Sequence, residues 1–283
     1  MRIPSVYICG AARTPYGKDG GAFENFSASK LGGIAIRGIV ETYTVPHEAI
    51  GGVIMGQVLT AGERQNPARH AALLAGLPPS TPAFVVNKVC SSSMTALECA
   101  VEKIQLGKAD IMIAGGMENM SRAPFFVRKE RKFFGDDTVG NLLEMKNPVI
   151  SKDSPALDSR FYDGLTEPSR EDSPTMAMLA DTCAREFKIS RDEQENYGYT
   201  SYMRALMAYQ KGYIRKYIIP VKMIEQGVLE RDECLRPPDL EKMKNMPTVF
   251  GCDTVTGATM AQIADGAAAV LVANERAIRE YSL

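Results

Sequence analysis

The sequence lacks long apolar runs and a strong net charge, and each absence excludes a class of partner. Its 283 residues carry 33 Lys and Arg against 34 Asp and Glu, a formal net charge of -1. Such a balance gives no positive field that would attract nucleic acid or an anionic membrane surface. No segment is long and apolar enough to predict a membrane span, and the amino terminus does not resemble a signal peptide. We therefore expect no nucleic-acid partner, no membrane partner and a cytoplasmic location.

Histidine is also scarce, and the cysteines are not spaced as metal ligands. The chain has only His47 and His70, and none of its six cysteines forms a C-x-x-C pair. Zinc sites in proteins combine cysteine and histidine ligands at short characteristic spacings, which are missing here. We therefore expect no bound metal, and free thiols as in a reducing compartment.

What the sequence does contain is an alternation of short apolar runs with helical patterns, typical of an α/β fold. Apolar strand candidates before residue 118 are 6–8, 52–59, 83–87 and 110–114. Between them, Asn66 followed by Pro67 predicts a helix start, and Gly76 predicts its end. Residues 1–117 are therefore predicted to form the first part of a core built on a mostly buried sheet.

The composition changes between residues 118 and 248, where charges and prolines dominate and 217–221 is the only strand-like run. Two helices are predicted there. One has an apolar stripe at Met176, Leu179, Ala180, Cys183 and Phe187. The other begins with the capping box of residues 190–193 and ends near Gly212. We interpret 118–248 as a mainly helical domain inserted into the core. Residues 249–283 return to the core with a strand at 265–272 and a final helix capped by Asn274.

Cys90 follows a β-branched strand and precedes an amphipathic helix in the segment VVNKVCSSSMTALECA. At a helix amino terminus, unpaired N–H groups and the helix dipole favour the thiolate, the nucleophilic form of cysteine. The alternative is a small buried hydrophobic residue, as most intracellular cysteines are. We expect residues 91–106 to be helical and largely buried through Met94, Leu97, Val101 and Ile104.

Several further segments, in order along the whole chain, resemble the thiolase family. They are ARTPYGKDGGAF, RQNPARHAALLAGLP, the segment around Cys90, GKADIMIAGGMENMSRAPF, DGLTEP, EFKISRDEQENYGYTSYMRA and DGAAAVL. The resemblance implies a βαβαβαββ half, with a mixed sheet between helix layers and an inserted loop domain. It also implies acyl transfer between acyl-CoA thioesters through an acylated Cys90. Gly115 and Gly116 are expected to let backbone approach the active centre closely.

By the same resemblance, the loop domain binds CoA, which serves as a substrate, so no separate cofactor is expected. The family's CoA contacts correspond to Leu165, Met176, Arg236 and Phe250 in this sequence. A guanidinium suits the phosphates of CoA, although Arg236 could equally be an exposed loop residue. The three apolar residues could equally belong to the core of the loop domain.

The sequence departs from the family pattern where substrate is expected to bind. Ser93 occupies the glycine position of the usual C-x-S-G, and Ala261, Gln262 and Ala264 replace a serine, a glycine and an asparagine. Neither His47 nor His70 matches the family's catalytic histidine, which belongs to a carboxy-terminal half absent from this sequence. We expect this chain to work with such a complementary half or as a homo-oligomer. The alternative is a non-catalytic, thiolase-like scaffold or partner subunit.

Overall fold

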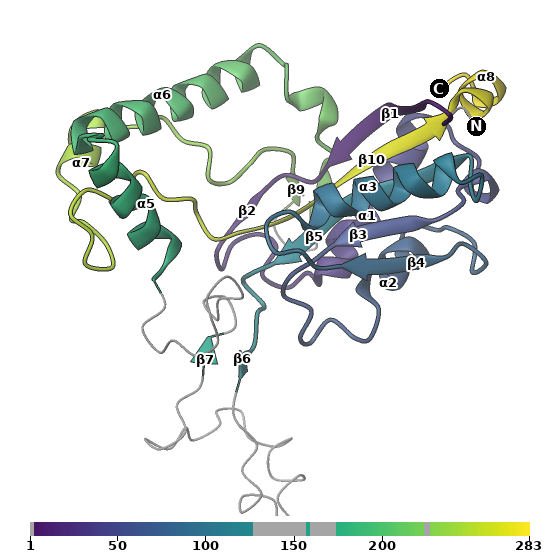
Figure 1. The fold of residues 1–283 in the computed structure, drawn as a ribbon, viewed down its shortest axis with the longest axis horizontal. Helices are drawn as coiled ribbons and strands as arrows, with labels where there is room; N and C mark the ends of the chain where they lie inside the picture. The colour runs from purple at the N-terminus through teal and green to yellow at the C-terminus, as the bar shows by residue number, and fades with distance from the viewer. Residues whose placement is uncertain (1–2, 127–156, 159–173, 224–226) are drawn as a thin grey trace, which may run out of the picture.

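The computed structural model describes residues 3–126, 157–158, 174–223 and 227–283, and its main element is one mixed sheet. The sheet has the order β1 (Val6–Arg13), β10 (Ala264–Asn274), β5 (Ile111–Asn119), β3 (Val53–Gly56) and β4 (Ala83–Val86), as Figure 1 shows. The short β2 (Gly17–Lys18) pairs with the start of β10. Strand β3 is parallel to β4 and β5, whereas β10 is antiparallel to β1 and β5.

Helices cover both faces of this sheet. On one face, α1 (Ala28–Thr42) and α2 (Pro67–Leu74) share an apolar core with residues such as Leu271 and Ile113. On the other face, α3 (Ser92–Gln105) packs Ala96, Ala100 and Ile104 against the sheet. Without β2, the turn before β3, the elements between β5 and β10 and the final helix, the order along the chain is βαβαβαββ. The expected fold class, a mixed sheet between helix layers, is therefore confirmed.

Outside the insertion, the residues predicted to begin and end helices are found at those positions. Asn66 Oδ1 accepts a hydrogen bond from Arg69 N at 3.1 Å, and Pro67 is the first residue of α2. Gly76 ends that segment with φ +90°, a conformation that glycine adopts without strain. Asn274 caps α8 (Glu275–Tyr281) by accepting from Ala277 N at 2.9 Å. A short 3-10 turn, η1 (His47–Ala49), leads into β3.

We call residues 174–262 the loop region, and Figure 1 shows its helices lying to one side of the sheet. It contains α5 (Met176–Glu186), α6 (Arg191–Gln210) and α7 (Leu240–Lys244), and the predicted capping box of Ser190 and Glu193 is present. The strand predicted at 217–221 is wrong for most of its length. A 3-10 turn, η2 (Arg215–Tyr217), occupies its start, and β8 (Val221–Met223) begins only at its last residue and pairs with β9 (Gly227–Leu229).

Two buried faces also differ from the expectation. In α3, Met94 is 62% exposed, and the buried stripe consists of Ser92, Ala96, Ala100 and Ile104. The small alanines let α3 approach the sheet closely; of the predicted stripe, Ile104 is buried, Leu97 and Val101 are half-buried, and Met94 faces outward. In α5, the predicted apolar stripe is exposed, while the buried residues are Ala177, Asp181 and Ala184.

The boundary predicted after residue 117 cuts through a strand, because β5 continues to Asn119, where it pairs with Asp265 of β10. The remaining small strands, β6 (Phe125–Phe126) and β7 (Leu157–Asp158), pair with each other. Within the described ranges, none of the helices has the length and apolar character needed to cross a membrane.

Candidate active site

A strained turn carries the chain from β4 into α3 and places Cys90 directly before the helix. Val89 has φ +52°, which is unusual for a β-branched residue. Such a strained conformation persists only where the surrounding structure enforces it. The turn is held by Ser92 Oγ, which accepts from Lys88 N at 2.9 Å and donates to Val89 O at 2.6 Å. Cys90 therefore lies at the predicted strand–helix junction, on a turn that resembles a nucleophile elbow. Its side chain is exposed.

Two neighbouring glycines let the start of α3 rest on the sheet backbone. Gly56 of β3 pairs with Gly116 of β5. A Cβ at Gly56 would lie 2.6 Å from Ser93 N, and a Cβ at Gly116 would lie 2.1 Å from Ser93 Oγ. The Gly56 position requires glycine because its Cβ would meet backbone, whereas at Gly116 the Ser93 hydroxyl would have to move. The close approach expected at Gly116 is thereby observed, and it sets the position of the turn that carries Cys90.

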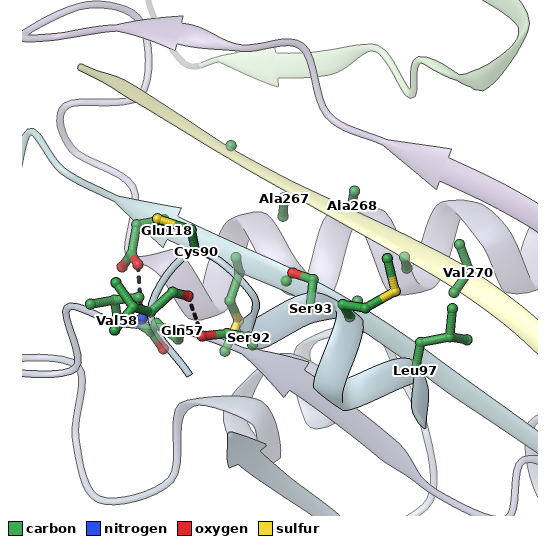
Figure 2. A pocket seen from close by; sticks show the side chains of 18 of the residues that line it. Gln57, Val58, Cys90, Ser92, Ser93, Leu97, Glu118, Ala267, Ala268 and Val270 are labelled. Atoms are coloured by element: carbon green, nitrogen blue, oxygen red, sulfur yellow. Dashed lines mark hydrogen bonds between the residues drawn. The ribbon is translucent and has the colours of Figure 1, made fainter. Parts of the chain in front are cut away.

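Cys90 lines a cavity of about 500 Å³ between the start of α3, the ends of β3 and β5, and the small residues of β10. Figure 2 shows Cys90, Gln57 and Glu118 at one end of it and Leu97 and Val270 at the other. The first end carries a thiol, an amide and a carboxyl, whereas the second is apolar. Such a combination suits a ligand with a reactive polar group and an aliphatic part.

Glu118 is the residue of this cavity that the sequence analysis missed. It lies near the end of β5, and its carboxylate accepts from Val58 N at 2.9 Å and from Leu59 N at 3.3 Å. Burial raises the pKa of Glu118, against the opposing effect of these backbone donors. The sequence did hold a signal, because an acidic residue in an otherwise buried strand is unusual without a specific role.

Gln57 adds an unsatisfied acceptor to the same end of the cavity. Its side chain is 1% exposed, and Nε2 donates to Leu59 O at 3.0 Å. Its Oε1 has no hydrogen-bond partner within the described part of the chain. Buried polar atoms are normally paired, so this oxygen is a place where a donor from water or a ligand would be stabilised.

Comparisons with known proteins agree with this geometry. The profile of the family described as "Thiolase, N-terminal domain" matches residues 6–276. The chain belongs to the thiolase family. It is 34% identical over 276 residues to a mitochondrial acetyl-CoA acetyltransferase of Danio rerio, covering 95% of this chain and 61% of that protein. It is 36% identical over 288 residues to a cytosolic acetyl-CoA acetyltransferase of Gibberella zeae, covering 99% and 68%.

Solved structures give the same result for the fold. The crystal structure of human mitochondrial 3-ketoacyl-CoA thiolase in complex with CoA matches with a TM-score of 0.86 and 32% identity. The match covers 99% of this chain and 67% of the human chain. This thiolase-family chain therefore spans about two thirds of the length of these relatives.

Both histidines of this thiolase-family chain lie away from the cavity. His47 Nδ1 is 2.9 Å from Gly76 O, which ties the turn after α2 to η1. His70 lies within α2 on the opposite face of the sheet from α3. Neither lines the space beside Cys90. Their placement agrees with the expectation that neither corresponds to the family's catalytic histidine.

The residues predicted to contact CoA are not gathered at this cavity. Met176 at the start of α5 is 61% exposed, Phe250 is 53% exposed, and Arg236 is exposed in the segment before α7. None of the three lines the Cys90 cavity. Leu165 lies outside the described residues. The CoA assignments therefore stay predictions from the family resemblance.

Ser93 lies in the first turn of α3, and the other three positions that depart from the family pattern lie around the start of β10. Gln262 is exposed, and its Nε2 donates to the Tyr202 hydroxyl of α6 at 2.9 Å. The amide in place of the family's glycine thus ties the segment before β10 to α6. Ala261 is exposed, and Ala264 is the first residue of β10.

Proposed function

We propose that this chain transfers acyl groups between acyl-CoA thioesters through an acyl-Cys90 intermediate. The reaction is acetoacetyl-CoA formation from two acetyl-CoA, or thiolysis of a 3-ketoacyl-CoA. Cys90 Sγ bonds to the thioester carbonyl carbon, the bond from that carbon to the CoA sulfur breaks, and the CoA sulfur leaves with a proton. The observation that carries the proposal is the placement of Cys90, on a strained turn before α3 and beside a cavity.

Apolar residues beside Cys90 form a surface that the described part of this chain does not cover. Next to Cys90, Met94 on α3 is 62% exposed, and Leu97 and Val270 line the open cavity without being fully buried. Exposed apolar surface beside an active centre is typical of an interface. We propose that a complementary carboxy-terminal part or a partner chain covers it, and that the chain alone self-associates. Leu165, Met176, Arg236 and Phe250 are the proposed CoA contacts, and the cytoplasm is the proposed location.

The test is acetylation of the purified chain by acetyl-CoA, followed by mass spectrometry of each cysteine peptide. We expect the acetyl group on Cys90, and no transfer in the Cys90→Ala variant. Cys183 is the matched control, because its thiol is also exposed but lies within α5. Its replacement by alanine is expected to leave transfer unchanged, and an acetyl group on Cys183 at the same rate would contradict the proposal.

The alternative is a non-catalytic scaffold, which the altered residues Ala261, Gln262 and Ala264 favour. Brief treatment with iodoacetamide distinguishes an enzyme with a nucleophilic Cys90 from a non-catalytic scaffold. A nucleophile is expected to label at Cys90 before the other five cysteines near neutral pH, whereas a scaffold labels only according to exposure. Full turnover is expected to require the complementary part, because forming the new carbon–carbon bond also needs a base for the α-proton.

A further inference from the structure

Two adjacent serines at the start of α3 differ in what their hydroxyl groups bind. Ser92 is buried, and its Oγ holds the turn through hydrogen bonds with Lys88 N and Val89 O. Ser93 is exposed and lines the cavity, and its hydroxyl makes no hydrogen bond within the described part of the chain. A hydroxyl has one proton to donate and two lone pairs that accept. Ser93 therefore offers the cavity a polar group that the fold itself does not use.

Packing, rather than a hydrogen bond, holds the Ser93 hydroxyl in place. It lies against the backbone of Gly116 of β5, so closely that a Cβ there would be 2.1 Å from Oγ. Ser93 belongs to the first turn of α3, and its backbone nitrogen would lie 2.6 Å from a Cβ at Gly56 of β3. The two glycines thus make room for Ser93 on the cavity wall.

Ser93 lies between the two ends of the cavity. Figure 2 shows it with Cys90 on one side and Leu97 on the other. Cys90 and Ser93 are three residues apart, so their Cα atoms lie within about 11 Å of each other. Ala267 and Ala268 of β10 also line the cavity and provide no hydrogen-bonding side chain. An acyl group that is attached to Cys90 and extends toward the apolar end therefore passes the Ser93 hydroxyl.

We propose that Ser93 is a specificity-determining residue that favours short 3-hydroxyacyl groups over unsubstituted acyl groups of the same length. This inference rests on the proposed function and names the class of acyl group that the same site takes. A hydroxyl on the third carbon of the acyl chain is four bonds from Cys90 Sγ and exchanges a hydrogen bond with Ser93 Oγ. An unsubstituted chain displaces water from Ser93 and leaves its hydroxyl without a partner, which costs free energy.

The first test compares the rates at which 3-hydroxybutyryl-CoA and butyryl-CoA acylate Cys90 in the full chain, using both enantiomers of the hydroxy compound. The ratio of the two rates is measured, because a general change in the reactivity of the thiol cancels in it. For at least one enantiomer, this ratio is expected to be about threefold to tenfold higher in the unmodified chain than in Ser93→Ala, as one hydrogen bond provides.

Ser91→Ala is the matched control and should leave the ratio unchanged. Ser91 is also an exposed serine without a side-chain cap hydrogen bond, but it does not line the cavity. Equal ratios in the unmodified chain and in Ser93→Ala would overturn the inference, and so would the same loss in Ser91→Ala. Should Ser93→Ala fail to fold, Ser93→Gly takes its place in the same comparison.

A second measurement tests Ser93 without acyl transfer. An equal mixture of 2-hydroxyethyl and propyl methanethiosulfonate converts the Cys90 thiol to mixed disulfides, with methanesulfinate as the leaving group. The hydroxyethyl adduct also places its hydroxyl four bonds from Sγ, and its share is expected to fall in Ser93→Ala but not in Ser91→Ala. If no thioester acylates Cys90 of the unmodified chain, the proposed function fails. The adducts then decide on Ser93 alone, and equal shares in the unmodified chain and in Ser93→Ala would reject its role.

Discussion

Different interactions stabilise the two regions of the molecule: the sheet with its covering helices, and the loop region. The sheet is packed on both faces by large apolar clusters, which include fully buried residues such as Ile54, Ile113 and Leu271. The loop region has a small cluster of three buried residues, Ala177, Cys252 and Val255, and relies more on directed polar contacts. The carboxylate of Asp181, for example, accepts from Asp253 N and Thr254 N and from the Thr254 hydroxyl.

The two kinds of packing are expected to differ in how firmly they hold the residues of each region in place. Dense apolar packing resists small displacements, so the sheet can hold the Cys90 turn and Glu118 in a fixed relation. A region held by helix caps and side-chain-to-backbone hydrogen bonds opens more easily. An ion pair between Arg13 of β1 and Asp232, at 2.7 Å, joins the sheet to the loop region.

The largest expected effect comes from a matched pair of leucines, one in each region. Leu271 of β10 is fully buried, so Leu271→Ala is expected to lower the free energy of unfolding by about 2–5 kcal/mol. Leu179 of α5 is 41% exposed, and Leu179→Ala is expected to change the free energy of unfolding by less than about 0.5 kcal/mol. Urea denaturation followed by circular dichroism measures both. Similar losses in the two variants would show that α5 is packed in solution as tightly as the sheet.

An intermediate effect is expected where α3 meets the sheet. Gly116→Ala places a Cβ 2.1 Å from Ser93 Oγ and should destabilise the chain by about 1–3 kcal/mol through overpacking. In the double variant with Ser93→Ala that oxygen is gone, and the nearest remaining contacts are 3.4 Å, so most of the loss should be recovered. Gly115→Ala is the control, because its new Cβ would lie 2.1 Å from the backbone oxygen of Ala268. Ser93→Ala cannot relieve that clash. Equal recovery at both positions would contradict this packing.

The smallest effect is expected in the loop region and depends on pH. The hydroxyl of Thr254, followed by the two backbone donors, lowers the pKa of Asp181 from 3.8 to about 2. Because the folded-state pKa is below the unfolded value, the stabilising contribution is present above about pH 4 and is lost as the pH falls toward 2.

Asp181→Asn is therefore expected to speed amide hydrogen exchange in α5 near neutral pH and to leave exchange in the sheet unchanged. The difference from the unmodified chain should shrink as the pH approaches 2. Glu186→Gln, an exposed change in the same helix, should leave the exchange of α5 unaltered at any pH. Faster exchange throughout the sheet in Asp181→Asn would mean that the two regions unfold as one unit.

The same contrast explains what the sequence could predict. Strands 6–8, 83–87 and 265–272 and the caps at Asn66, Ser190 and Asn274 depend on local chemistry, and the structure places each of them as predicted within a few residues. The position of Cys90 followed from the same signals, because a strand and a helix start lie on either side of it.

The sequence could not show which side of a helix is covered. Met94 and Leu179 fit a helical stripe, but both are exposed, since small residues at Ala96, Ala100, Ala177 and Ala184 make the contacts instead. Close packing through alanine and glycine depends on what lies opposite, which periodicity does not contain. Glu118 was missed for a related reason. Its importance comes from the cavity that β3, β5 and α3 form together, rather than from its neighbours in the chain.

The position of β10 between β1 and β5 also sets an order of events during synthesis. β1 and β5 do not pair with each other, and each waits for residues 264–274, which emerge only after the whole loop region has been made. At about 5–20 residues per second, that delay is on the order of ten seconds on the ribosome. During this time both strands expose unpaired edges that can join a neighbouring chain. The nascent polypeptide is therefore most exposed to misassembly just before its longest strand arrives, and a chaperone that shields those edges would raise the yield of folded protein.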